Sequence, residues 1–154
     1  MKGRSGKGDV VAAVCYRREN DQVEFLLVKT TGRSKWTFPK GHVKKGEAPA
    51  HAAAREAREE AGAIGFVTAE PLSRYVYAGG SDGGGERPVE AYLLAVVAQS
   101  EPESGEEFRN PTWFDGEAAK GKFAEGREGE ERYVDEHRRV IDEALKRMGA
   151  ARGR

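Results

Sequence analysis

The stretch from Gly41 to Ala63 restricts the possible folds of this chain more than any other part of its sequence. It reads GHVKKGEAPAHAAAREAREEAGA. Pro49 suits the first turn of a helix, and Gly62 suits the left-handed residue that ends one. The pattern therefore predicts a loop over 41–46 and then a helix from about Pro49 to Ala61.

Three acidic side chains of that helix stand at positions i, i+3 and i+4, so they share one face. They are Glu56, Glu59 and Glu60. Like charges this close destabilise a helix unless a cation lies among them. Hard divalent cations such as Mg²⁺ take oxygen ligands and bridge carboxylates to substrate phosphates. The pattern therefore predicts a site for a metal ion and a phosphate group.

A simpler interpretation of the same helix is a solvated face of mixed charge. Arg55 and Glu59 have the i,i+4 spacing of an ordinary surface ion pair. The residues before the helix argue against this interpretation, because a solvated face requires neither Gly41 nor Glu47 at a fixed offset.

The spacing Gly-x5-Glu-x7-Arg-Glu-Ala-x-Glu-Glu-x-Gly resembles the Nudix box, which marks hydrolases of nucleoside diphosphates linked to another moiety. Every charged and glycine position is present, while Ala57 and Ala63 stand where the family has larger aliphatic residues. The resemblance implies an α/β (α+β) fold with a mixed β-sheet sandwiched between α-helices. It also implies one domain over 9–148, between a flexible basic tail at 1–8 and a second tail at 149–154.

The resemblance assigns roles to the residues of the box. The implied ligands for Mg²⁺, or for Mn²⁺ in its place, are the Gly41 carbonyl and the side chains of Glu56, Glu59 and Glu60. Glu47 and Arg55 would form a pair that closes the loop onto the helix and orients the metal ligands. One carboxylate of the cluster, or a glutamate outside the box, would act as general base. The outside candidates for extra metal contacts are Glu103, Glu106 and Glu107.

The run WTFPKGHV, over 36–43, resembles the segment that leads into the box in diadenosine polyphosphate hydrolases. A dinucleoside polyphosphate is therefore the first expected substrate. Lys40 would hold a phosphate as a point charge, and His42 would contact the polyphosphate chain or the leaving group. The other candidates for substrate binding are Lys35, Arg87, Tyr77 and Tyr92. The two tyrosines are included because a nucleobase stacks on aromatic rings.

Other substrates stay open at this stage. Arg87-Pro88-Val89 matches the Lys-Thr-Val strand of the diadenosine polyphosphate hydrolases only loosely. Inositol pyrophosphates are the nearest alternative, since Nudix enzymes acting on them have a similar Pro-Lys-Gly run, and damaged nucleoside triphosphates come third. A Nudix regulator that binds a nucleotide without cleaving it is the alternative of another class. The complete arginine and glutamate set of the box argues for catalysis instead.

Composition limits the partners that we expect. The 154 residues carry 26 Lys or Arg and 26 Asp or Glu, so no net charge attracts nucleic acid or a membrane surface. RNA ends are for this reason a disfavoured substrate. The sequence is long enough for one domain with a single core, and it leaves the oligomeric state open. The lone Cys15 excludes a disulfide framework and suggests a reducing compartment, the cytoplasm.

Apolar, β-branched runs and turn residues predict the remaining elements. The expected strands cover 10–16, 23–29, 36–38, 71–77, 89–97 and 111–114. A flexible glycine-rich hairpin tip is expected over 79–86, and a polar, glycine-punctuated connection after Phe114. The apolar positions of 130–148 recur at helical spacing, so this segment is expected to be an amphipathic helix that packs on the core.

Overall fold

The computed structural model of the chain describes residues 9–30, 35–78, 85–102 and 108–149. The strands are β1 (Val10–Glu19), β2 (Gln22–Lys29), β3 (Trp36–Thr37), β4 (Lys40–His42), β5 (Ala63–Val67), β6 (Ser73–Ala78), β7 (Glu86–Gln99) and β8 (Thr112–Asp115). The helices are α1 (Pro49–Ala61), α2 (Gly116–Lys122) and α3 (Glu131–Met148). The expected tip over 79–86 lies outside the described residues except at its end, as do both predicted tails apart from Gly149.

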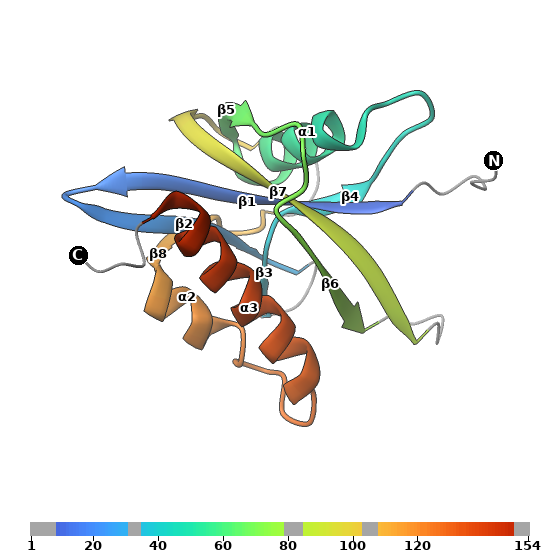
Figure 1. Cartoon of the computed structure of the whole chain (residues 1–154), viewed down its shortest axis with the longest axis vertical. Coiled ribbons are helices and arrows are strands. Elements are labelled where there is room, and N and C mark those ends of the chain that lie inside the picture. The colour runs from blue at the N-terminus through green and yellow to red at the C-terminus, as the bar shows by residue number, and fades with distance from the viewer. Residues whose placement is uncertain (1–8, 31–34, 79–84, 103–107, 150–154) are drawn as a thin grey trace.

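The strands form one mixed sheet in the order β3-β2-β1-β7-β5, to which β4, β6 and β8 are added beside β1, β7 and β2. Only the central pair β1–β7 is parallel among the described strand pairs. Helix α1 covers one face of the sheet, and α2 and α3 cover the other (Figure 1). This arrangement confirms the predicted mixed sheet between helices.

Helix α1 packs closely on the sheet because its inner face is made of alanines. Four of them, Ala52, Ala53, Ala57 and Ala61, are fully buried against residues of β1, β2 and β7. The helix ends at Gly62, whose φ of 71° is left-handed. A side chain at this position would also collide with the Ser100 carbonyl. The predicted limits of the helix are therefore confirmed, and the close packing fixes the acidic face beside β4.

Several sequence expectations need correction. The loop predicted to begin at Gly41 starts as strand β4, because its backbone pairs with β1, as in the pair Val11–Gly41. Strand β5 was missed, since Gly65 interrupts its apolar pattern at a shift in register. The polar connection after Phe114, to which the sequence assigns no element, contains helix α2, which Asp115 caps by accepting a hydrogen bond from the Ala118 amide.

Candidate functional site

Arg55 is the centre of the polar cluster between α1 and the loop before it. Its Nε and Nη2 donate to the two carboxylate oxygens of Glu47 at 2.8 and 2.9 Å. Its Nη2 also donates to the His42 carbonyl at 3.1 Å. The hydrogen bonds from Arg55 lower the pKa of Glu47 to about 2. The predicted pair is thus present, and it attaches the loop to the helix.

The same guanidinium also reaches the acidic face of the helix. Its Nη1 lies 3.0 Å from Glu56 and 3.4 Å from Glu59. The Arg55 side chain is only 12% exposed, so these charge-assisted contacts are little screened by water. One arginine therefore places three carboxylates of the box relative to one another.

Glu60 is held from the other side of the cluster. Its Oε1 accepts a hydrogen bond from the Lys40 amide at 3.2 Å, and its Oε2 lies 3.4 Å from Arg109 Nη1. Burial, opposed by Arg109 and reinforced by Glu56, raises the pKa of Glu60 to about 7. Burial likewise raises the pKa of Glu56, against the influence of Arg55.

Gly41 leaves room for the Glu56 carboxylate. A Cβ at position 41 would lie 2.6 Å from Glu56 Oε1 and closer still to the other atoms of that carboxylate. The backbone of β4 and the acidic face of α1 therefore approach as closely as they do only because residue 41 has no side chain.

The oxygen donors of this site suit a hard divalent cation. Glu56 and Glu60 lie one turn apart on the same face of α1, and the Gly41 backbone lies against the first of these carboxylates. Within the described residues, no group of three or more His, Cys, Asp or Glu side chains is already arranged to hold a metal ion. Glu59 is instead turned toward Arg55. Glu103, Glu106 and Glu107 lie outside the described residues.

Lys40 projects onto the other face of the sheet, toward α3. It pairs with Ala12 of β1, which belongs to the core under α2 and α3. Its Nζ lies 4.9 Å from the centroid of the Tyr77 ring. Burial lowers the pKa of Lys40, Glu60 opposes this shift, and the nearby Arg127 adds to it. Arg127 itself donates to the carbonyls of Trp36 and Phe123, so it fastens the connection between α2 and α3 to β3.

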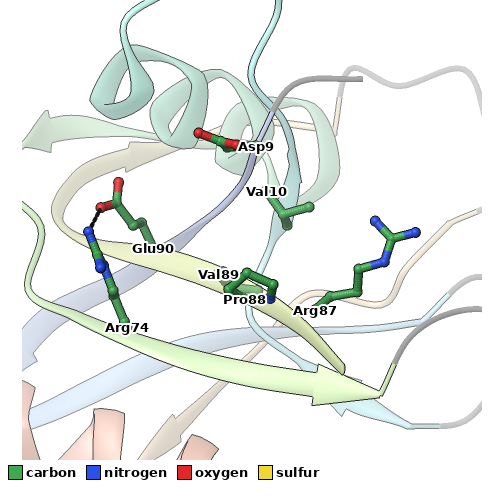
Figure 2. A pocket seen from close by; sticks show the side chains of 7 residues that line it. All are labelled: Asp9, Val10, Arg74, Arg87, Pro88, Val89 and Glu90. Carbon is green, nitrogen blue, oxygen red and sulfur yellow. Dashed lines mark hydrogen bonds and ion pairs between the residues drawn. The ribbon is translucent and has the colours of Figure 1, made fainter. Parts of the chain in front are cut away.

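A pocket of about 320 Å³ opens where β1 begins, between β4 and strands β6 and β7. Figure 2 shows the residues that line it: Asp9, Val10, Arg74, Arg87, Pro88, Val89 and Glu90. Arg74 and Glu90 form an ion pair of 2.8 Å on one side, and Arg87 extends on the other (Figure 2). The Asp9 carbonyl accepts the Val43 amide, so the pocket adjoins the box loop.

The structure brings only some of the predicted substrate residues together. Arg87 pairs with Tyr77 across β6 and β7, on the face that also carries Lys40. Exposed His42 pairs with Val10 at the edge of the pocket. The other two candidates lie elsewhere. Lys35 pairs with Glu130 at 3.5 Å, before α3.

Tyr92 is buried on the opposite face, under α1, and is therefore not an exposed platform for a base. Its hydroxyl donates to Glu90 at 3.1 Å. Burial and this hydrogen bond raise the pKa of Tyr92 to about 12. Arg109 and Arg127 are the polar residues of the site that the sequence did not indicate, because neither belongs to a spaced motif.

Comparison with known proteins connects this geometry to a family. A family model of the NUDIX domain matches residues 7–137. A 45-residue segment is 49% identical to the asymmetrical bis(5'-nucleosyl)-tetraphosphatase of Sus scrofa, and covers 29% of this chain and 31% of the relative. The corresponding protein of Mus musculus is 47% identical over 47 residues, which are 30% of this chain and 32% of that protein. The matched segment thus spans about a third of these relatives.

Solved structures share the fold over nearly the whole chain. A Caenorhabditis elegans Ap4A hydrolase in a binary complex superposes with a TM-score of 0.72 at 23% identity, covering 92% of this chain and 98% of that one. The NUDIX domain of Shewanella oneidensis NrtR, complexed with ADP ribose, gives a TM-score of 0.66 at 16% identity, with coverages of 96% and 90%. At these identities the likeness establishes the fold alone. Among the described helices, none is both long and apolar enough to cross a membrane.

Proposed function

Because the chain belongs to the Nudix hydrolase family, we propose that it cleaves a phosphoanhydride bond of a dinucleoside polyphosphate with the help of Mg²⁺. The observation that carries this proposal is the cluster in which Arg55 holds Glu47, Glu56 and Glu59 while the Lys40 amide and Arg109 hold Glu60. A structural helix has no need for such a concentration of half-buried carboxylates.

Glu56, Glu59 and Glu60 are the side chains that would hold the metal ion, together with the carbonyl of Gly41. When bound, the ion would supply charge neutralisation for the phosphates and a lower pKa for the attacking water. Glu47 would act through Arg55, since it orients the guanidinium that places Glu56 and Glu59. Burial raises the pKa of both Glu56 and Glu60, so one carboxyl of this neighbouring pair would act as the general base.

The substrate would lie on the α3 face, across β4 from the carboxylates. Lys40 would bind a phosphate there, and Arg87 would bind a second one from the edge of the pocket. The ring of Tyr77 lies beside Lys40 and opposite Arg87, where a nucleobase can stack. His42 would contact the polyphosphate chain from the rim. The resemblance of 36–43 to diadenosine polyphosphate hydrolases and the segmental identity to the Sus scrofa enzyme support diadenosine tetraphosphate as the substrate.

The test is a product analysis with purified protein and Mg²⁺. The panel contains diadenosine tetraphosphate, a diphosphoinositol phosphate, 8-oxo-dGTP, ADP-ribose and a capped RNA. We expect hydrolysis of diadenosine tetraphosphate to ATP and AMP, detected by chromatography, and loss of turnover on addition of EDTA. Preferential cleavage of another compound would support the metal-dependent hydrolysis but refute diadenosine tetraphosphate as the substrate. Tight binding without cleavage of any compound would identify a regulator.

The lone cysteine supports a reducing location, and we propose the cytoplasm. Cys15 is fully buried in β1, and burial raises the pKa of its thiol to about 12. Such a thiol is a packing residue and not a nucleophile. A small nucleotide is the only partner that the proposed activity requires.

A further inference from the structure

Arg109 supplies Glu60 with a cation from outside the box. The two side chains are only 19% and 11% exposed, and their charged atoms lie 3.4 Å apart. The arginine of the box itself, Arg55, is engaged with Glu47, Glu56 and Glu59. Glu60 therefore forms its ion pair with a guanidinium from the segment before β8, in addition to a weaker attraction from Lys40.

The backbone presents Arg109 in a fixed position. Its carbonyl accepts a hydrogen bond from the Lys29 amide at 2.8 Å, at the end of β2. Asn110 follows with a left-handed φ of 53°, and Pro111 then restricts the chain as it enters β8. Strand β8 pairs with β2, beginning with Thr112 opposite Leu27. A residue anchored in this way loses little conformational freedom when it forms an ion pair.

We propose that Arg109 is a positioning residue that holds Glu60 and lowers the affinity of the box for divalent cations. This inference rests on the metal assignment of the proposed function. A guanidinium at 3.4 Å occupies one oxygen of Glu60 and repels a second cation that approaches the same carboxylate. Removal of this charge strengthens the attraction between the remaining carboxylates and a divalent ion. The direction of the change in metal affinity distinguishes two roles. If Arg109 only oriented Glu60, its removal would weaken metal binding.

The experiment measures Mn²⁺ binding by isothermal titration calorimetry, without substrate, for the wild type, Arg109→Gln and Arg109→Lys. We expect Arg109→Gln to bind Mn²⁺ about five- to tenfold more tightly, the scale of one partly buried ion pair. Arg109→Lys keeps the charge and should stay within about twofold of the wild type. The matched control is Arg17→Gln, which removes an ion pair of 2.8 Å with Glu24 on β1 and β2 and should not change the affinity.

Thermal unfolding provides the second readout. In EDTA, Arg109→Gln should melt below the wild type, because Glu60 loses its ion pair. Saturating Mn²⁺ should then raise the melting temperature of the variant more than that of the wild type. If Arg109→Gln lowers the melting temperature equally with and without Mn²⁺, and its affinity for Mn²⁺ is unchanged, Arg109 only fastens α1 to the sheet. This result would overturn the proposal.

The remaining outcomes are also decisive. Weaker Mn²⁺ binding by Arg109→Gln, or tenfold weaker binding by Arg109→Lys if the glutamine variant fails to fold, contradicts the proposal. A raised KM with unchanged Mn²⁺ affinity would show that Arg109 contacts the substrate, and would overturn it too. If the wild type itself binds no Mn²⁺, the metal assignment of the proposed function fails. If wild type and variant bind Mn²⁺ equally, only the role proposed for Arg109 fails.

Discussion

Replacement of Gly41 by alanine tests whether the position of the Glu56 carboxylate controls activity. The new Cβ would lie 2.6 Å from Glu56 Oε1, whereas ordinary contact begins at 3.4 Å. The carboxylate must therefore move by about 1 Å, and a misplacement of this size costs on the order of 100-fold in rate. The same movement changes the contact of Glu56 with Arg55 Nη1, which is 3.0 Å in the wild type. The fold should tolerate the change, because the obstructed group is the end of a flexible side chain.

The assay combines kcat for diadenosine tetraphosphate with the free energy of unfolding in urea. We expect kcat of Gly41→Ala to fall about 100-fold and the free energy of unfolding to change by about 1 kcal/mol. Gly121→Ala is the control, since a Cβ there meets nothing within 4 Å in helix α2. It should keep full activity and leave stability equal or slightly higher. A kcat of Gly41→Ala within threefold of the wild type would refute the argument from close approach.

Three further predictions concern single side chains. Glu59→Gln should keep the melting temperature and lose orders of magnitude in kcat, since it removes a proposed metal ligand; near-normal turnover would end that assignment. Lys40→Ala should raise KM more for a dinucleoside polyphosphate than for a nucleoside diphosphate-sugar, and equal losses would make Lys40 structural. Burial lowers the pKa of His137 to about 3 from its ordinary 6.5, so the folded state binds fewer protons and stability falls as pH drops below 6.5. The free energy of unfolding, measured in urea, should fall by about 2 kcal/mol between pH 7 and pH 5. His137→Phe should abolish this pH dependence, whereas substitution of the exposed His51 by Gln should leave it unchanged.

The residues of the box were predictable because each carries a local signal. Pro49 and Gly62 mark the ends of α1, and the structure has the helix between them. The spacing of Glu47 and Arg55 predicted a pair, and the structure joins them through two hydrogen bonds. Such features depend on chemistry within about 20 residues of sequence, which is the range over which turn and helix rules operate.

The parts that the sequence did not indicate depend on contacts between distant segments. Strand β4 has little strand propensity of its own and exists because β1 pairs with it. Gly65 looks like a break in a strand, yet a side chain there would collide with the carbonyl of Ala95, so the glycine permits β5 to approach β7. Arg109 has neither a motif nor a periodic position. Its proposed role follows only from the fold, in which its backbone bonds to the end of β2 and its side chain reaches Glu60 of α1.

The two faces of α1 explain why the acidic cluster stays in place and is not separated by movement of the helix. The alanines of the inner face leave no long side chains on which the helix could shift, so it packs directly on β1 and β2. Burial then raises the pKa of Glu56 and Glu60, which is unfavourable for folding because both carboxyls must lose water or keep a proton. Arg55 and Arg109 offset part of this cost. The negative charge that remains uncompensated is concentrated at one place, which is where the proposed function puts a divalent cation beside a polyphosphate.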